Sequence, residues 1–414
     1  MLRAAPSIPS RECCIYKVPV ILRSINEAAY TPQIISIGPL HQGDKNLQPM
    51  EAYKLHFLKT LLVRKPNIQL KDYVETLRGM EKQVRNCYFD QEFVCKFSSN
   101  DFVQMMLLDG CFIVELLTRY SPGNIEGLPV PYTISLYSDM KLFENQLPYF
   151  LLEHLFNFIN GKPYTTAPIS FYNCAVLHLC GMDYVKKDAT DQLGRSGNQV
   201  KHFVDLILNC HLLSASTLTD RVSVENESNR EFTFIPSATE LHDRSGVKFK
   251  KGESPCYLDI TFKSGVLEIP TLVIEDTTEL NLRNMIAMEQ CDARNTAHIS
   301  CYMFLLDSLI STPKDVALLR HRGIIKNCLG SDEEVADLVN KLGSGVNACP
   351  WDSPYYEDLK KIHVFYNRRR NKWKANLKRN YFHTPWMTLS FIAALVLLIC
   401  TVAQTVCSFL SLKK

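Results

Sequence analysis

The sequence lacks the motifs of the common enzyme classes. Its 414 residues contain no Gly-x-Ser-x-Gly elbow, no Gly-rich phosphate-binding loop, no His-Glu-x-x-His pair and no protein-kinase motif set. The 11 histidines are scattered without the spacing of metal ligands. The sequence therefore predicts no catalytic residue, no metal site and no cofactor.

Paired cysteines are also missing. The chain holds 15 cysteines, an odd number, and no two of them form a Cys-x-x-Cys motif. Several lie within apolar helical patterns, where a reduced cysteine behaves as a small hydrophobic residue. We therefore expect free thiols in a reducing compartment rather than a disulfide framework.

Acidic residues are absent from the last part of the chain. Residues 360–414 contain eleven Lys and Arg side chains but neither Asp nor Glu, so residues 1–359 hold 35 basic and 43 acidic groups. An acidic body does not attract the phosphate backbone of a nucleic acid. We expect no nucleic-acid partner for this chain.

The same part of the chain contains its longest uncharged segment. Trp386–Leu412 comprises 27 mainly apolar residues without a charge. A helix of that length reaches roughly 40 Å, whereas the hydrocarbon core of a bilayer is about 30 Å thick. The sequence therefore predicts a transmembrane helix over 386–412, preceded by a basic juxtamembrane helix over 360–385.

The charges on either side of this segment predict its orientation. The first ten residues contain two prolines and no apolar run as long as the core of a signal peptide, so we expect a tail-anchored, single-pass protein. Only two lysines follow the span, and by the positive-inside rule the basic side faces the cytosol. The sequence is compatible with a plasma membrane and with an endomembrane. The basic flank either sets orientation alone or also binds anionic lipid headgroups, and its members are Arg368, Arg369, Arg370, Lys372, Lys374, Lys378 and Arg379.

Helical periodicity dominates the body. Apolar residues recur at helical spacing, for example in 50–64 and 298–311. Around 246–274, apolar and polar residues alternate between glycines, which predicts short antiparallel strands. No repeat or linker divides the body. The predicted fold is mainly α: a short tail over 1–14, a multi-helix globular domain over 15–359 with a small antiparallel β-sheet, and one C-terminal transmembrane helix.

Five sequence blocks follow one another in a defined order. Their order and spacing resemble the plant-specific family called domain of unknown function 247, which includes uncharacterised UPF0481-type membrane proteins. The resemblance covers nearly the whole chain, and the blocks are long enough to be specific. They are Ile15-Tyr-Lys-Val-Pro19 with Tyr30-Thr-Pro-Gln-Ile-Ile-Ser-Ile-Gly-Pro39; Asp109-Gly-Cys-Phe-Ile-Val-Glu115; Asp139 with Glu144-Asn-Gln-Leu-Pro-Tyr-Phe150; Leu267-Glu-Ile-Pro270 with Leu282-Arg-Asn-Met-Ile-Ala-Met-Glu-Gln290; and Pro385-Trp386 with Thr401-Val-Ala-Gln-Thr405.

The resemblance implies a plant protein with a C-terminal membrane helix. The resemblance does not imply an enzyme, because the family has no established activity. Some grass members are associated with pollen-side self-incompatibility, which points towards recognition or signalling.

Polar residues interrupt the apolar helices of these blocks. Burying such groups without partners costs on the order of 2–7 kcal/mol each, so we expect them to find partners. One interpretation is a buried hydrogen-bond network that fixes helix packing; the other is a carboxylate-lined catalytic cleft. We favour the network, because neither a nucleophile nor a metal pattern accompanies these residues: Asp109, Glu115, Glu144, Asn145, Gln146, Arg283, Asn284, Glu289 and Gln290.

Small and polar residues share one face of the predicted membrane helix. Such a stripe lets membrane helices approach and hydrogen-bond, although Ser and Thr also bond to the backbone of their own helix. Self-association, or pairing with another single-span protein, is one expectation, and tolerated polarity is the alternative. The stripe consists of Ser390, Ala394, Thr401, Gln404, Thr405 and Ser408.

Two functions remain open from the sequence. The first is a non-enzymatic, membrane-anchored interaction or signalling protein, supported by the predicted anchor and the missing catalytic motifs. The second is an unrecognised hydrolase or transferase that uses the acidic blocks. A cleft with two carboxylates of raised pKa favours the enzyme, whereas a filled, hydrogen-bonded core favours the interaction protein.

Overall fold

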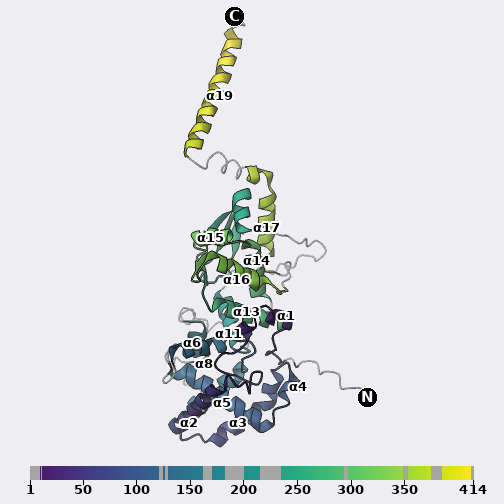
Figure 1. Ribbon diagram of the computed structural model, residues 1–414, viewed down its shortest axis with the longest axis vertical. Coiled ribbons are helices and arrows are strands. Elements are labelled where there is room, and N and C mark those ends of the chain that lie inside the picture. The colour runs from purple at the N-terminus through teal and green to yellow at the C-terminus, as the bar shows by residue number, and fades with distance from the viewer. Residues whose placement is uncertain are drawn as a thin grey trace, which may run out of the picture.

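The computed structural model has an elongated body with one long helix projecting from its end (Figure 1). The mainly helical fold with a C-terminal apolar helix is the one predicted from the sequence. The structure describes residues 10, 12–120, 125, 129–161, 170–181, 200–214, 235–292, 297–347, 353–373 and 385–411.

The N-terminal half of the body is a helical bundle built around α5. This helix is buried on most of its faces, because apolar residues occupy far more than one stripe of its sequence. It packs against α2, α3, α7 and α8. The bundle and its flanking helices comprise α1 (Val20–Arg23), η1 (Glu27–Tyr30), α2 (Gln48–Arg64), α3 (Leu70–Asn86), α4 (Gln91–Val94), α5 (Ser99–Arg119), α6 (Val130–Asp139), α7 (Tyr149–Asn160) and α8 (Phe171–Leu179).

Two helices, α11 (Phe203–Ser214) and α13 (Thr278–Cys291), form the middle of the body (Figure 1). Helix α11 packs against α8 and α13, and α13 packs against η1 and α14. They therefore join the N-terminal bundle to the C-terminal half.

The C-terminal half carries the strands. Strands β1 (Lys248–Lys251), β3 (Val266–Ile269) and β2 (Thr261–Lys263) form one sheet in that order, and β4 (Leu272–Ile274) pairs with β5 (Ile325–Asn327) in another. The β1–β3 and β4–β5 pairs are parallel and only β2–β3 is antiparallel, so the predicted antiparallel sheet is corrected to one mixed three-stranded sheet and one parallel pair of strands. Pro270 separates β3 from β4, because proline lacks the amide hydrogen that a continuing strand would donate.

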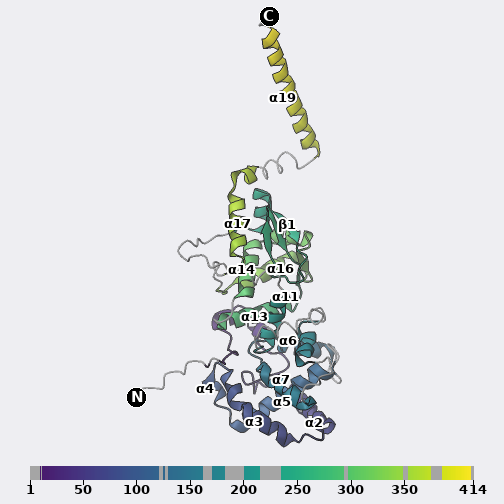
Figure 2. The ribbon, with the colours of Figure 1, turned by 180° about the vertical axis from the view of Figure 1, so that it is seen from behind.

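Helices surround these sheets (Figure 2). Helix α15 begins with a capping box in which Thr312 and Asp315 exchange hydrogen bonds, and Pro313 occupies the first helical position. The helices here are α12 (Ala238–Glu240), the π-helical turn η3 (Leu241–Ser245), α14 (His298–Leu309), α15 (Pro313–His321), α16 (Asp332–Gly343) and α17 (Tyr356–Asn367).

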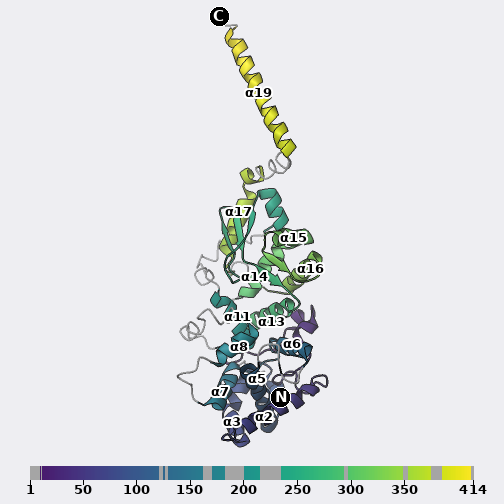
Figure 3. The same cartoon turned by 90° about the vertical axis from the view of Figure 1, so that its left-hand side faces the viewer.

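The predicted basic helix over 360–385 is not continuous. Helix α17 ends at Asn367, and Arg368 has an extended backbone with ψ of 117° before a short helical turn over 369–373. Helix α19 (Pro385–Ser411) then stands apart from the body (Figure 3).

Helix α19 is long and apolar enough to cross a membrane. Leu389–Ser408 has a mean hydropathy of 2.3, and none of this span is buried against the rest of the described chain. An unburied apolar helix of this length suits a lipid environment rather than water. Membrane association is therefore indicated by length and composition.

Candidate functional site

The N-terminal segment 13–47 crosses the bundle mostly without regular structure. Its buried backbone groups cannot pair along a helix or a strand, so they need partners elsewhere. Most of those partners are side chains from the polar positions of the sequence blocks. We call this arrangement the segment clamp; its side chains are Asp109, Asp139, Glu144, Asn145, His202 and Asn284.

Asp139, at the end of α6, binds the middle of the segment. Its carboxylate accepts hydrogen bonds from the amides of Gln33, Ile34 and Ile35 at 2.9, 2.7 and 2.9 Å. Burial raises the pKa of Asp139 to about 6, although the three amides act in the opposite direction. The side chain is thus fully occupied by backbone donors.

Asn145 continues this contact along the segment. Its amide oxygen accepts from the amide of Ile37 at 2.7 Å, and its amide nitrogen donates to the carbonyls of Ile35 and Asp139 at 3.0 Å each. A side chain that donates and accepts at once can bind an extended backbone much as a neighbouring strand does. Asn145 therefore fixes the path of this part of the segment.

Asp109 on α5 pairs with a fully buried lysine. The Lys54 ammonium lies 2.6 Å from one oxygen of Asp109 and also donates to the Ser36 carbonyl at 2.6 Å. The other Asp109 oxygen accepts from the amide of Gly38 at 2.8 Å. Gly38 has φ of 71°, and a Cβ there would lie 2.8 Å from the Gln146 carbonyl oxygen, so only glycine fits.

Glu144 holds the start of the segment. Its carboxylate accepts from the Val18 amide at 2.5 Å and lies 2.6 Å from the Arg23 guanidinium and 3.2 Å from His41 Nε2. Burial raises the pKa of Glu144, but His41, Arg23 and the Val18 amide together lower it by more, so the pKa lies below its usual value. The charged form is therefore stabilised inside the protein.

Asn284 joins α13 to both the segment and the loop after α6. Its amide oxygen accepts from the Phe143 amide at 2.8 Å, and its nitrogen donates to the Ala29 carbonyl at 2.8 Å. Gln146 makes a comparable link, accepting from the Phe203 amide at 2.9 Å. These two amide side chains therefore tie the middle helices to the N-terminal bundle.

The other predicted residues on α13 form separate groups. Glu289 accepts from the amides of Ile299 and Ser300 and from the Ser300 hydroxyl, all at 2.8 Å. Burial raises the pKa of Glu289 to about 7. Gln290 donates to the same hydroxyl at 3.2 Å, whereas Arg283 pairs with Glu279 at 2.7 Å. The nine predicted residues therefore make several local contacts rather than one continuous network.

Two members of the segment clamp, Asp139 and His202, and the partner of Asp109, Lys54, are not among the polar positions predicted from the sequence. Asp139 appears there only within a block, and Lys54 only within the helical range 50–64. His202 Nδ1 accepts from the Asp205 amide at 3.3 Å, so Nε2 carries the proton and donates to the Cys14 carbonyl at 3.1 Å. Burial lowers the pKa of His202 to about 3. Nothing in the sequence around Asp139, Lys54 or His202 indicated that these side chains are buried.

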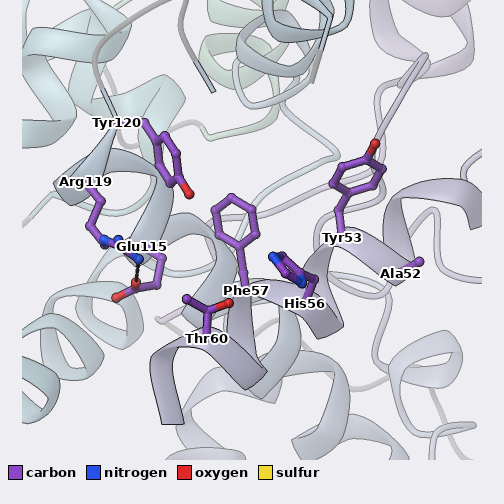
Figure 4. A pocket seen from close by; sticks show the side chains of 8 residues that line it. All are labelled: Ala52, Tyr53, His56, Phe57, Thr60, Glu115, Arg119 and Tyr120. Carbon is purple, nitrogen blue, oxygen red and sulfur yellow. Dashed lines mark hydrogen bonds and ion pairs between the residues drawn. The ribbon is translucent and has the colours of Figure 1, made fainter. Parts of the chain in front are cut away.

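Glu115 stands apart from the segment clamp, at a surface pocket. The pocket has a volume of about 500 Å³ and is lined by aromatic side chains from α2 and by Glu115, Arg119 and Tyr120 at the end of α5 (Figure 4). Glu115 pairs with Arg64 and lies 3.4 Å from Arg119. His56 and Thr60 face the same space.

Metal and thiol chemistry gain no support from the described residues. Within them, no group of three or more His, Cys, Asp or Glu side chains is placed to hold a metal ion. No disulfide bond is formed by the cysteines in the described ranges. The side chains of the segment clamp mostly bind backbone groups of the protein itself.

The membrane-facing residues are described in part. Arg368, Arg369, Arg370 and Lys372 are exposed, whereas the flank residues Lys374, Lys378 and Arg379 lie outside the described residues. On α19, Thr401 donates to the Leu397 carbonyl and Thr405 to the Thr401 carbonyl, both at 2.8 Å. These two hydroxyls thus bond to their own helix, which is the alternative interpretation of the stripe. The stripe residues Ser390, Ala394, Thr401, Gln404, Thr405 and Ser408 are all exposed.

Comparison with known proteins identifies the family. The sequence profile of DUF247, described as plant protein of unknown function, matches residues 15–400. The chain belongs to the DUF247 family. As a DUF247 chain it is similar to the UPF0481 protein At3g47200 of Arabidopsis thaliana, with 27% identity over 432 residues that cover 98% of this chain and 88% of the relative. It is also similar to the putative UPF0481 protein At3g02645 of Arabidopsis thaliana, with 25% identity over 475 residues, 93% of this chain and 88% of the relative. No solved structure matches this DUF247 chain.

Proposed function

We propose that this protein is a non-enzymatic, membrane-anchored interaction or signalling protein whose body faces the cytosol. Helix α19 supplies the anchor, and the acidic helical body meets partners from the cytosol. Recognition processes such as self-incompatibility, which the family resemblance implies, are one setting for this role. The choice between the plasma membrane and an endomembrane stays open in this proposal.

One observation carries the proposal: the carboxylates of the family blocks are occupied by the protein's own backbone. Asp139 and Glu289 have the raised pKa values that a catalytic acid needs, yet each accepts three hydrogen bonds from the protein's own groups: Asp139 from three backbone amides, and Glu289 from two buried amides and the Ser300 hydroxyl. A catalytic group must reach a substrate within hydrogen-bond distance. These two side chains are 2% and 4% exposed, and neither lines the pockets found among the described residues.

Proximity labelling in the native tissue tests the proposal. A labelling enzyme is fused to the N-terminus of the full chain, and in the matched control to residues 374–414 alone. We expect the full chain to label a defined set of cytosolic proteins that the anchor alone does not label. Identical sets from both fusions contradict an interaction function of the body.

The stripe on α19 supports a second contact, within the membrane. Gln404 lies one turn from Thr401 and Ser408 on the same face, and an amide at this depth is favoured when a neighbouring helix accepts its hydrogen bonds. We include self-association, or pairing with another single-span protein, in the proposal.

The pocket beside Glu115 favours the alternative function, a hydrolase or transferase. It combines a carboxylate, His56 and Thr60 in one cavity. Glu115→Gln distinguishes the two functions: as a structural ion-pair partner of Arg64 and Arg119 its loss lowers the melting temperature, whereas strained active-site groups are often relieved by mutation. A raised melting temperature supports the enzyme.

A further inference from the structure

The outer face of the β1–β3–β2 sheet is basic. Lys248 and Lys250 on β1 and Lys263 on β2 share one face, because the register pairs Lys248 and Lys263 with Val266 of β3 and Lys250 with Glu268. The opposite face is apolar, with Phe249, Phe262 and Leu267 buried. The sheet therefore presents lysines outward and packs its apolar face on the body.

The β2–β3 turn and α17 form a groove on the apolar side of this sheet, where Phe262 packs against Phe365. A Cβ on Gly265 would lie 2.5 Å from the Phe365 ring, so the turn rests directly on α17. The groove has a volume of about 440 Å³. Its basic lining consists of Lys360, Lys361 and Arg368, and its apolar lining includes Val364 and Phe365.

This groove lies at the end of the body from which the membrane helix departs. Helix α17 is the element that leads towards α19, and the sheet lies beside it in both views of that end (Figures 1 and 2). Only eleven residues, 374–384, separate the described turn after α17 from α19, so the chain allows at most roughly 40 Å between Trp373 and Pro385. The groove is thus within reach of the surface of the membrane that α19 enters.

Exposed apolar side chains at this end agree with a lipid surface. Val364 is 50% exposed and Trp373 is 72% exposed, next to the exposed arginines at 368–370. Tryptophan and long basic side chains are enriched where a protein meets lipid headgroups.

We propose that the groove between the β2–β3 turn and α17 binds the headgroup of a phosphoinositide in the membrane that α19 enters. The inference rests on the proposed membrane anchoring and adds a specific lipid site to it. Lys360, Lys361 and Arg368 contact the phosphate groups, and Val364 and Phe365 contact the glycerol and the first acyl carbons. Glu357 lines the same groove, and its buried Oε1 has no hydrogen-bond partner among the described residues, so it accepts from a ring hydroxyl.

Lys361 shows why a ligand is favoured over the existing contacts. Its ammonium lies 3.4 Å from Asp358 and remains 58% exposed, so that pair contributes little. A phosphate group offers more acceptor oxygens and more charge than this carboxylate. Three basic side chains that converge on one headgroup then bind more strongly than the same charges spread over a surface.

The test uses the full chain in detergent micelles and native mass spectrometry with dioctanoyl phosphatidylinositol 4-phosphate. The groove variant combines Lys360→Gln, Lys361→Gln and Arg368→Gln. Its matched control combines Arg369→Gln, Arg370→Gln and Lys372→Gln, which removes the same charge from neighbouring residues outside the groove lining. Melting temperature and gel-filtration volume show that both variants fold.

We expect the groove variant to bind the lipid about 100-fold more weakly and the control less than tenfold more weakly. Equal losses in the two variants overturn the proposal, because they show a general attraction to charge. Displacement of the lipid by inorganic phosphate at equal concentration also overturns it. Resistance of the same proteins to carbonate extraction from vesicles tests the anchor separately, so failure of the lipid site and failure of the anchor are distinguished.

Discussion

At the scale of single residues, short polar side chains hold an irregular segment in place. Asp139 and Asn145 together bind six backbone groups, five of them on residues 33–37. A backbone hydrogen bond contributes only about 1 kcal/mol net, but an unpaired buried group costs more. These side chains are therefore needed for the segment to be buried at all.

The first prediction concerns two of the block carboxylates. Glu144→Ala leaves the Val18 amide and the Arg23 guanidinium without their acceptor, and Glu289→Ala leaves the Ile299 and Ser300 amides unpaired. We expect each variant to lose about 1–3 kcal/mol or more of unfolding free energy in chemical denaturation. Glu253→Ala, at an exposed position, is the control and should change little. Unchanged or raised stability in the first two variants would favour the enzyme alternative.

The second prediction concerns His202 and pH. The folded pKa of about 3 lies below the unfolded value of about 6.5, so the neutral form is favoured by folding. This contribution is fully present above pH 6.5 and is lost as the pH falls towards 3. Between pH 7 and pH 5 the loss from this residue is about 2 kcal/mol.

His202→Gln removes this titration and is the comparison for the pH experiment. Asp139 and Glu289 have raised pKa values and act in the opposite direction, since protonation below those values favours the folded state. The difference between the two chains therefore isolates the histidine. If the unfolding free energy of both chains changes equally between pH 7 and pH 5, His202 is not buried as a neutral group.

The residues of the segment clamp could be predicted only in part. Glu144, Asn145 and Asn284 are polar positions within apolar sequence blocks, and this marked them as buried groups in need of partners. Asn284 lies in α13 as expected, but Glu144 and Asn145 lie in the loop between α6 and α7 rather than within a helix. Their partners could not be predicted, because they are backbone groups 126, 108 and 255 residues away in the sequence. The structure places these residues in several groups of contacts, most of which run to backbone groups rather than between the predicted side chains.

At the scale of elements, helices were predicted better than strands. The helix at 50–64 has its counterpart in α2, because the helical spacing of apolar residues is visible over many turns. The strands have only three or four residues, and a pattern that short does not specify a pairing direction. Strand β5 was missed because its partner β4 lies about fifty residues earlier in the chain.

The third prediction concerns the β2–β3 turn. Ser264 has φ of 51°, a left-handed conformation that costs a non-glycine residue roughly 1–2 kcal/mol. Ser264→Gly relieves this cost but raises the conformational entropy of the unfolded chain, which opposes folding, so we expect a net gain of up to about 1 kcal/mol in thermal unfolding. Ser264→Val should lower the melting temperature. A fall in stability with glycine would show that the serine side chain makes a contact that outweighs the strain.

At the scale of the whole molecule, α19 projects from the end of the body opposite to α2 and α3 (Figure 1). The body buries its own apolar core, whereas α19 is apolar and is not buried at all. The two parts of the chain therefore suit two different solvents. The length and composition of the span could be predicted from sequence alone. The interruption at Arg368 could not, because basic residues are compatible with helix as well as with loop.

The fourth prediction concerns association of the span. Replacing Thr401, Gln404 and Thr405 by Leu removes the polar groups that a neighbouring helix would bind, at about 0.6–2 kcal/mol per contact. We expect weaker crosslinking of the full chain in vesicles with unchanged insertion. Leu replacements at Val402 and Val406, on another face, are the control. Equal crosslinking in the two variants would mean that the stripe is only tolerated polarity, with its hydroxyls bonded to the backbone of their own helix.

The central claim is that α19 anchors a self-contained cytosolic body, and extraction of membranes with alkaline carbonate tests it most directly. The full chain is compared with a chain that ends at Thr384, and protease is added to intact vesicles in parallel. We predict that the full chain stays in the membrane pellet with its body accessible to protease, whereas the shortened chain appears in the supernatant as a monodisperse, folded protein. A shortened chain that remains in the pellet would contradict the account. So would a body that is protected from protease and glycosylated at Asn226, the acceptor position of the sequon Asn226-Glu-Ser228.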